Sequence, residues 1–431
     1  MRFLSGSKIV DVKAREVLDS RGNPTVEAEV RTASFKVTAI APSGASTGTH
    51  EVLELRDGGE RFLGRGVLRA VENVNRRIAP KLKGMDVEDL DAIDQAMIEL
   101  DGTPNKSKLG GNAVVAVSLS AAKAGALSKG VELYEHLGPG SCTLPVPMMN
   151  IINGGRHAGT GLNIQEFMVV PAGAGTFADA LRMGAEVYHN LKAILKEAYG
   201  PSAVNLGDEG GFAPPFETTK QALDTIVKAI DKAGYVPGKD VFLAMDCAAS
   251  EFCSGGVYTL DKRRIGPVEL METYFGLVKN YPVVSIEDPF HEEAFDMMSA
   301  ITRRLGHKVQ LVGDDMFVTN VERIRKAIAS KAGNATLLKV NQIGSVSEAI
   351  AAARLSFDNG YRVVVSHRSG ESEDVSIADL TVALECGQIK TGAPARGERT
   401  AKYNRLLRIE EELGSKARFP GTSLYAKRPK E

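Results

Sequence analysis

The chain has 431 residues, more than a single hydrophobic core normally supports, so its length favours two domains over one. It is 43% hydrophobic and 25% charged, as expected for a globular protein, and its 53 basic and 54 acidic residues nearly cancel, so we expect neither a nucleic-acid partner nor an anionic-membrane surface. The first residues, MRFLSGSKIV, lack the apolar core of a signal peptide, and no stretch has the length of a membrane span, which predicts a cytoplasmic protein.

The N-terminal part of the sequence has the pattern of an α+β domain. Three extended segments are predicted, SKIVDVKAREVLD, PTVEAEV and SFKVTAIAP, and in the second of them apolar residues alternate with glutamates. The pattern is helical from about residue 64 to 137 and ends in HLGPGSCTLP, whose glycines and prolines are typical of a boundary. We therefore place a first domain at residues 1–138 and a second at 139–431.

Strands and helices alternate in the second domain. Eight runs have strand character: 145–152, 166–170, 241–246, 283–287, 309–314, 335–341, 361–366 and 387–391. Two helical segments, near 175–199 and 217–234, follow the second run, and amphipathic helices such as 320–333 follow most of the later ones. The order ββαα(βα)6 indicates an α/β fold with a parallel sheet closed into a (β/α)8-type barrel. An open doubly wound sheet is the alternative architecture.

Charged side chains end six of the predicted strands: Asp246, Glu287, Asp314, Lys339, His367 with Arg368, and Lys390. In a parallel barrel these positions meet at the carboxyl-end face, where catalytic groups are found. The three carboxylates would repel one another unless a cation neutralised them, and a site built from carboxylate oxygens favours Mg²⁺ over Zn²⁺. A salt-bridge cluster with the two lysines is the alternative interpretation.

The segment VVVSHRSGESED places a base, a permanent cation and a hydroxyl where a strand ends. Arg368 can hold a phosphate or carboxylate through a bidentate fork, and Ser369 and His367 add further polar contacts, so we predict an anion site. A lysine beside a metal has its ammonium form disfavoured, so its pKa falls and it can act as a base. Lys339 is the predicted base.

A second acidic group is expected near the segment NLGDEGGF. Glu209 precedes paired glycines there, and Glu166, which opens the second barrel strand, could pair with it. Two carboxyl groups in one site separate their pKa values, which leaves one protonated and able to act as an acid. A loop-capping pair of Asp208 and Glu209 is the plain alternative. The segments PSGASTG and NGGRHAG suit loops that close over a ligand.

These segments together resemble the enolase family. The matching motifs, in chain order, are LDSRGNPTVE (18–27), PSGASTG (42–48), GDEGGF (207–212), MDCAASEF (245–252), IEDPF (286–290), GDD (313–315), LLKVNQIG (337–344), SHRSGESED (366–374) and IKTGAPARGERTAKYNRLLRIEEEL (389–413). The resemblance covers nearly the whole chain. It implies an N-terminal α+β capping domain, a catalytic barrel, and a lyase that converts 2-phosphoglycerate to phosphoenolpyruvate in glycolysis and gluconeogenesis.

The resemblance also implies a metal site and an acid–base pair. Asp246, Glu287 and Asp314 would hold a first Mg²⁺, and Ser46 would join a second Mg²⁺ when substrate is bound. Lys339 resembles the general base that removes the C2 proton, and Glu209 resembles the acid that helps the C3 hydroxyl to leave as water.

The remaining site residues are implied to contact the substrate. Glu166 and His157 are similar to groups that support the acid and the substrate, and Glu287 and Asp314 would also line the substrate site. Arg368 and Ser369 match phosphate contacts, His367 matches a further substrate contact, and Lys390 matches the partner of the substrate carboxylate. The family further implies a homodimer and allows a higher oligomer.

Some segments depart from the family pattern: the chain has no Trp, and both PFHEEAF and the tail KARFPGTSLYAKRPKE are unusual. Two other functions remain as alternatives. A superfamily dehydratase acting on another acid would keep the metal carboxylates but would not need SHRS to hold a phosphate. A binding protein with the enolase fold and no turnover would not need an intact Lys339 and Glu209.

Overall fold

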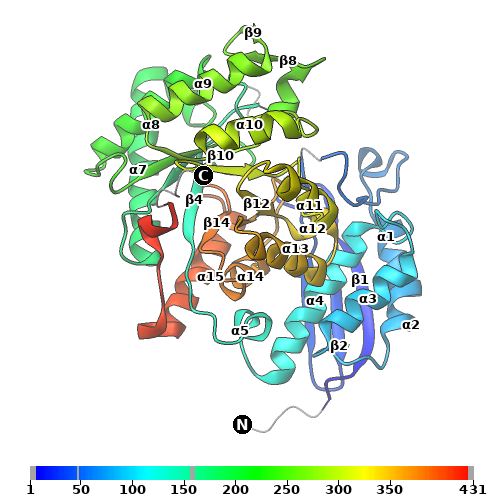
Figure 1. Ribbon diagram of the computed structural model, residues 1–431. Coiled ribbons are helices and arrows are strands. Elements are labelled where there is room, and N and C mark those ends of the chain that lie inside the picture. The colour runs from blue at the N-terminus through cyan, green and yellow to red at the C-terminus, as the bar shows by residue number, and fades with distance from the viewer. Residues whose placement is uncertain (1–5, 46–47, 156–160, 426–431) are drawn as a thin grey trace.

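The N-terminal part of the chain is an antiparallel sheet covered by helices (Figure 1). The computed structural model describes residues 6–45, 48–155 and 161–425. Its first sheet has the order β1-β2-β3, formed by β1 (Ile9–Leu18), β2 (Pro24–Thr32) and β3 (Lys36–Ile40). The apolar residues Val26, Ala28 and Val30 of β2 are fully buried, as the predicted strand requires. However, Glu29 on the other face is buried as well, where it pairs with Arg15 and Arg31.

The helices of this part are η1 (Arg61–Gly64), α1 (Leu68–Asn73), the π-helical η2 (Val74–Ile78), α2 (Ala79–Leu82), α3 (Leu90–Asp101), α4 (Gly111–Lys129) and α5 (Leu133–Leu137). Helix α4 is buried on almost every side because it lies between the sheet and the rest of the molecule. On one side the Ser120 hydroxyl donates to the carbonyl of Ala28 at 2.7 Å. On the other side the Ser118 hydroxyl accepts the backbone N–H of Val346 at 2.9 Å, at the start of α13 (Val346–Asp358). This helix therefore joins the two parts.

A closed barrel of eight strands forms the second part, which excludes the open doubly wound sheet. Its order is β10-β11-β12-β13-β14-β4-β5-β6. The strands are β4 (Val146–Asn153), β5 (Glu166–Val170), β6 (Phe242–Asp246), β10 (Val283–Glu287), β11 (Gln310–Gly313), β12 (Ala335–Leu338), β13 (Arg362–Ser366) and β14 (Gln388–Lys390). The predicted ββαα(βα)6 order is thus observed.

The prediction of an all-parallel barrel is wrong at one strand, because β5 pairs antiparallel with both β4 and β6. Apolar patterning does not encode strand direction, since the same side chains face inward whichever way the strand runs. The reversal has a consequence for the site. Glu166, the first residue of β5, lies opposite Asp246, the last residue of β6, so both side chains lie at the carboxyl end of the parallel strands.

Helices surround the barrel (Figure 1). They are α7 (Phe177–Tyr199), α8 (Thr219–Lys232), α9 (Pro267–Asn280), α10 (Phe295–Leu305), α11 (Val321–Ser330), α12 (Val340–Ile343), α13, α14 (Ser376–Ala383) and α15 (Gly397–Leu413), with the short turns η3 (Pro201–Val204), η4 (Ala249–Phe252) and η5 (Gly414–Lys416). The predicted strand 335–341 ends early, at Leu338, because Lys339 is the N-cap of α12. A small sheet of β7 (Cys253–Ser254), β8 (Val257–Leu260) and β9 (Arg263–Ile265) was not predicted.

The C-terminal tail covers the amino-terminal end of the barrel. Its last turn, η6 (Gly421–Tyr425), places Leu424 and Tyr425 against the apolar interior of the strands, together with Phe419. The Tyr425 hydroxyl donates to Oε1 of Gln388 at 3.1 Å, and Gln388 is the first residue of β14. The tail that is unusual in sequence therefore lies at the end of the barrel opposite the strand-end charges.

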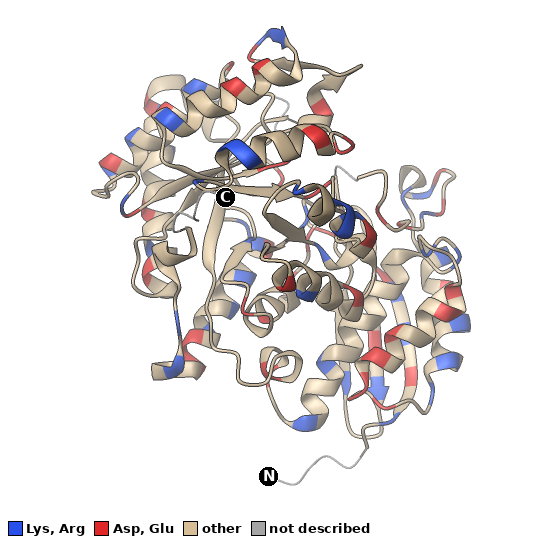
Figure 2. Ribbon diagram, in the orientation of Figure 1, with Lys and Arg blue, Asp and Glu red and all other residues tan. Residues whose placement is uncertain are grey.

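Charged side chains of both signs are mixed over the outer helices seen in Figure 2. This distribution agrees with the near-zero net charge of the sequence. Among the helices of the described residues, none has the length and apolar composition needed to cross a membrane.

Candidate active site

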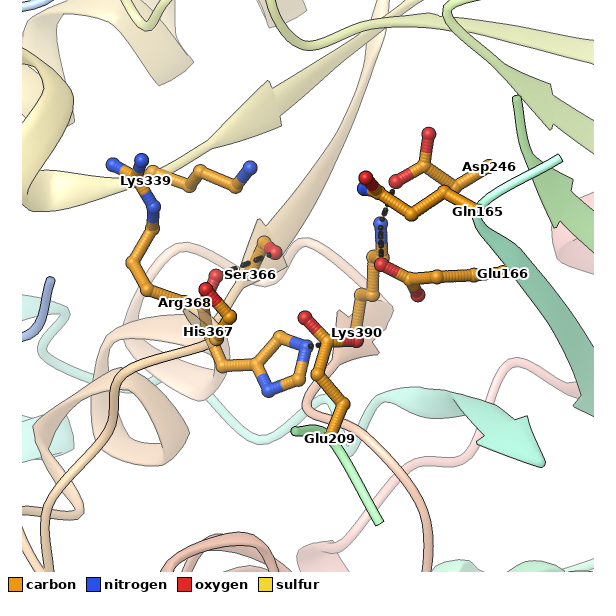
Figure 3. Close-up of a pocket in the computed structure, with 10 residues that line it drawn as sticks. Gln165, Glu166, Glu209, Asp246, Lys339, Ser366, His367, Arg368 and Lys390 are labelled. Carbon is orange, nitrogen blue, oxygen red and sulfur yellow. Dashed lines mark hydrogen bonds and ion pairs between the residues drawn. The ribbon is translucent and has the colours of Figure 1, made fainter. Parts of the chain in front are cut away.

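A pocket lies at the carboxyl end of the barrel strands (Figure 3). It is lined by Gln165, Glu166, Glu209, Asp246, Lys339, Ser366, His367, Arg368, Ser369 and Lys390. All of these except Gln165 and Ser366 were predicted as site residues. Glu287 and Asp314 contact the two lysines of the pocket, whereas Ser46 and His157 lie outside the described residues. The structure thus brings together side chains from strand ends that are far apart in the sequence.

Lys390 is surrounded by carboxylates. Its Nζ lies 2.8 Å from Oδ2 of Asp246, 2.9 Å from Oε1 of Glu287 and 3.2 Å from Oε1 of Glu166. Burial by itself would lower the pKa of Lys390, but the carboxylates raise it well above its ordinary value. Burial raises the pKa of Glu287, and the nearby charge of Asp246 adds to this effect. The ammonium therefore partly neutralises a group of acids that are costly to bury as anions.

Lys339 lies on the other side of the pocket from Lys390 (Figure 3), and it pairs with Asp314. The second oxygen of Asp314 accepts a hydrogen bond from the Gln342 amide at 2.8 Å. Burial opposes the charged form of Lys339, yet the charge of Asp314 raises its pKa. The sequence predicts a lowered pKa for Lys339, whereas the structure gives a raised one. The predicted fall in pKa would need a divalent cation that neutralises the negative charge of Asp314.

The acidic residues at the ends of β6, β10 and β11 suit a hard metal ion. Asp246 and Glu287 are neighbours in register on adjacent strands, and Asp314 directly follows β11, so all three stand on the same barrel rim. Their oxygens do not all lie within 4.8 Å of one another, because Asp246 and Glu287 surround Lys390 while Asp314 pairs with Lys339. Their present partners are lysine ammonium groups, as in the alternative of a salt-bridge cluster. The same carboxylate oxygens could instead bind a divalent cation, because an ammonium group and a metal ion are both attracted by their negative charge.

A further acidic group overlaps this set. Oxygens of Asp288, Asp314 and Asp315 lie within 4.8 Å of one another, which makes them a second possible ligand set. The Asp288 carboxylate accepts the backbone N–H groups of Asp314 at 2.9 Å and Asp315 at 2.7 Å, so it holds the end of β11 in place. The sequence predicts no role for Asp288 or Asp315, although each directly follows a predicted ligand in IEDPF and GDD.

Arg368 is 3% exposed and its fork faces a carboxylate from the N-terminal part of the chain. Its two terminal nitrogens donate to Glu51 at 2.9 and 3.1 Å, and one of them also donates to the Asn341 side-chain oxygen at 3.1 Å. The Ser369 hydroxyl accepts the backbone N–H of Ala45 at 2.7 Å. Glu51, for which the sequence predicts no role, thus occupies the bidentate fork of this arginine, and the binding of a substrate anion there stays a prediction.

Glu209 and His367 face each other across the pocket (Figure 3). Oε2 of Glu209 lies 3.4 Å from Nε2 of His367 and accepts a hydrogen bond from the Asn150 amide at 3.0 Å. Burial lowers the pKa of His367 to about 4, so its imidazole is neutral at pH 7. Burial and the charge of Glu209 raise the pKa of Glu166 well above its ordinary value. One carboxyl of this pair can therefore hold a proton at neutral pH.

This fold and this site define a barrel protein with an α+β N-terminal part and an acid-rich, lysine-bearing pocket at the strand ends. The family model described as "Enolase, N-terminal domain" matches residues 9–137, and the one described as "Enolase, C-terminal TIM barrel domain" matches residues 141–428. The chain belongs to the enolase family.

Curated relatives named enolase match almost the whole chain. The protein from Methanocaldococcus jannaschii is 60% identical over 409 residues, which cover 94% of this chain and 96% of the relative. The protein from Thermococcus kodakarensis is 58% identical over 417 residues, covering 96% of this chain and 97% of the relative. The protein from Corynebacterium kroppenstedtii is 55% identical over 424 residues, covering 97% and 99%.

Proposed function

We propose that this protein is a magnesium-dependent lyase that catalyses the reversible dehydration of 2-phosphoglycerate to phosphoenolpyruvate. One observation carries the proposal beyond family membership. Lys339, partly buried directly after β12, and the buried pair of carboxyl groups at Glu166 and Glu209 line the same pocket as Arg368 and Ser369, the proposed anion-binding residues. Removal of a proton and departure of a hydroxyl need a base and an acid on one substrate, and this pocket holds both types of group.

The metal would be held by the chain's strand-end acids. Asp246, Glu287 and Asp314 would hold the first Mg²⁺, and Ser46 would join a second when substrate is bound. When bound, Mg²⁺ supplies positive charge that neutralises these acids and the charge developing on the substrate. The all-oxygen character of the ligand set supports Mg²⁺ over softer metals.

The chain's own residues perform the proton transfers. Lys339, once released from Asp314, removes the C2 proton of 2-phosphoglycerate. Glu209 then gives a proton to the C3 hydroxyl, which leaves as water. Glu166 supports this acid as the second carboxyl group of the pair. Each transfer by a positioned group contributes about 10²–10⁴-fold to the rate.

The substrate is held by cations and a hydroxyl at opposite sides of the pocket. Arg368 and Ser369 take the phosphate, His367 and His157 add polar contacts, and Lys390 pairs with the carboxylate. Both terminal nitrogens of Arg368 donate to the Glu51 carboxylate, so the guanidinium already has the orientation that a bidentate anion needs. A substrate phosphate would take the place of that carboxylate. A dehydratase acting on an acid without a phosphate would have no use for these contacts.

The family resemblance supports several broader proposals. The chain divides into a capping domain at residues 1–138 and a catalytic domain at 139–431. It forms a homodimer and acts in the cytoplasm, in glycolysis and gluconeogenesis.

Ultraviolet absorbance tests the proposed function directly, because phosphoenolpyruvate absorbs where 2-phosphoglycerate does not. The purified chain should generate phosphoenolpyruvate from 2-phosphoglycerate with Mg²⁺ and should stop after chelation of the metal. A folded, metal-loaded protein without this activity would refute the proposal and favour a binding protein with this fold.

A further inference from the structure

Arg399 of α15 is 0% exposed and connects the two loops that carry the candidate acid and the anion site. One terminal nitrogen lies 2.6 Å from Nδ1 of His367 and donates to the carbonyl of Arg368 at 2.6 Å. The other donates to the carbonyls of Ser369 at 2.6 Å and Asp208 at 3.0 Å. The guanidinium thus holds the loop after β13 against the loop that contains Glu209.

The contact between Arg399 and His367 determines where the imidazole carries its hydrogen. A guanidinium is only a donor and stays protonated in proteins, so Nδ1 of His367 must be the acceptor. A neutral imidazole has a single N–H, which is therefore on Nε2. Burial keeps the ring neutral by lowering its pKa to about 4; the charge of Arg399 acts in the same direction, whereas Glu209 and Glu371 oppose it. Nε2 faces Oε2 of Glu209 at 3.4 Å.

This tautomer has a consequence for the carboxyl group of Glu209. Oε2 already accepts a hydrogen bond from the Asn150 amide at 3.0 Å, and Nε2 of His367, which makes no hydrogen bond of its own among the described residues, lies 3.4 Å from the same oxygen, so its N–H is the nearest further donor for that oxygen. An oxygen that faces two donors is disfavoured as the site of a proton, so the proton of the acid belongs on Oε1. The two donors also stabilise the carboxylate that remains after Oε1 has given its proton away.

We propose that Arg399 is a positioning residue for the dehydration step: it fixes His367 as the Nε2–H tautomer, so that Glu209 delivers its proton from Oε1. In this step the electron pair left at C2 forms the C2=C3 double bond, the C–O bond at C3 breaks, and the proton from the O–H bond of Glu209 joins the departing hydroxyl as water. The inference rests on the proposed function, since it assigns the orientation of that acid.

Lys402 provides a matched control on the same helix. It lies three residues after Arg399, is likewise fully buried, and braces the same loop by donating to the carbonyl of Ser372 at 2.6 Å and pairing with Glu371 at 2.9 Å. The contacts of Lys402 are therefore with Ser372 and Glu371 and not with the His367 ring. A purely structural role for α15 would make the two cations equivalent, whereas the proposal separates them.

The first test reads the tautomer without any assay of activity. In the full chain labelled with ¹⁵N-histidine, long-range ¹H–¹⁵N correlation spectra distinguish a protonated from an unprotonated ring nitrogen, and the signals of His367 are identified among the seven histidines by their loss in His367→Gln. We expect an unprotonated Nδ1 and a protonated Nε2 at every pH from about 5.5 to 8. An Nδ1–H tautomer, or a ring that becomes charged in this range, would overturn the proposal.

The second test compares Arg399→Met, Arg399→Lys and Lys402→Met. In Arg399→Met we expect mixed tautomers of His367, a ring pKa that rises, and dehydration slowed by about tenfold or more relative to exchange of the C2 hydrogen with solvent, because only the acid step loses its orientation. Arg399→Lys should restore part of both signals, since an ammonium also donates to Nδ1. Lys402→Met should keep the wild-type tautomer and the wild-type ratio of dehydration to exchange, whatever its thermal stability.

The outcomes distinguish a failure of the proposed function from a failure of the positioning role of Arg399. A wild-type chain without exchange or dehydration refutes the proposed function, while the tautomer is still read from the spectrum. A wild-type rate ratio in Arg399→Met, or an equal change in Lys402→Met, refutes the positioning role alone. If Arg399→Met does not fold, the wild-type spectrum and Arg399→Lys decide, because Arg399→Lys keeps a buried cation and changes only the geometry of its donors.

Discussion

Replacing Lys339 by Met and Glu209 by Gln should separate removal of the C2 proton from loss of the C3 hydroxyl. Lys339→Met keeps the unbranched stem of the side chain and removes the ammonium. Glu209→Gln keeps the shape of the acid but leaves it without a proton to give. If Lys339 acts first and Glu209 second, the lysine variant should lose both exchange of the C2 hydrogen and dehydration, whereas the glutamine variant should lose dehydration alone.

The structure sets the expected size of these effects. A positioned acid or base contributes about 10²–10⁴-fold, which corresponds to about 2.7–5.4 kcal/mol in the barrier. Loss of the ammonium leaves Asp314 with its hydrogen bond from Gln342 at 2.8 Å, so we expect the rim of the barrel to stay folded. In Glu209→Gln the new amide oxygen can still accept from Asn150, whose amide donates to Glu209 at 3.0 Å in the native chain. Both losses should therefore appear in the rate and not in folding.

Two assays on parallel samples report the two steps. Proton magnetic resonance of 2-phosphoglycerate in deuterated buffer follows exchange at C2, and ultraviolet absorbance follows phosphoenolpyruvate. Circular dichroism of each variant checks that the fold is retained. Exchange that survives in Lys339→Met and disappears in Glu209→Gln would reverse the two roles. Loss of both signals in a folded Glu209→Gln would show that Glu209 acts before or during proton removal.

Other sites give separate expectations. Asp246→Ala should weaken Mg²⁺ binding, measured by isothermal titration calorimetry, by at least about 10–100-fold, since even groups beyond the direct ligands have effects of this size; unchanged affinity would contradict its assignment as a ligand. Arg368→Lys keeps the charge but loses the fork seen with Glu51, so KM for 2-phosphoglycerate should rise roughly 10–100-fold, and unchanged kinetics would argue against bidentate binding. Leu424→Ala combined with Tyr425→Ala should lower the free energy of unfolding in urea by roughly 2 kcal/mol, and an unaltered value would show that the tail does not stabilise the barrel. Because burial lowers the pKa of His367 to about 4, the unfolded chain takes up its proton first and stability should fall as the pH drops from about 6.5 toward 4; His367→Gln should flatten this dependence, and an identical slope would disprove it.

The strand-end residues could be predicted because the carboxyl ends of the parallel strands of a barrel all lie on one face, so residues that end successive strands in the sequence come together there. Each predicted strand ends within a few residues of an observed one, so Asp246, Glu287 and Lys390 lie at the rim as expected. The direction of β5 could not be predicted, because a buried strand has the same apolar pattern in either direction. Glu166 was nevertheless expected in the site, through its pairing with Glu209.

Long-range partners were not accessible from the sequence. Glu51 and Arg368 are 317 residues apart, and nothing in local spacing indicates which carboxylate reaches which guanidinium. Arg399 stands within a family-like motif, yet in a helix rich in charged residues its burial cannot be read from periodicity. Charged residues of this kind become visible as site residues only once their burial and their hydrogen-bond partners are known.

Strand β14 closes the barrel by pairing with β13 on one side and β4 on the other. It is also the last strand along the described residues, so a chain growing on the ribosome carries two unpaired barrel edges until residues 388–390 emerge. Unpaired strand edges are templates for association with other chains. The barrel cannot close on this chain before just over nine tenths of it has been synthesised, since Lys390 is residue 390 of 431. A premature stop ahead of β14 would therefore produce an aggregation-prone protein without Lys390, and a stop just after β14 would produce a barrel without α15 behind its site.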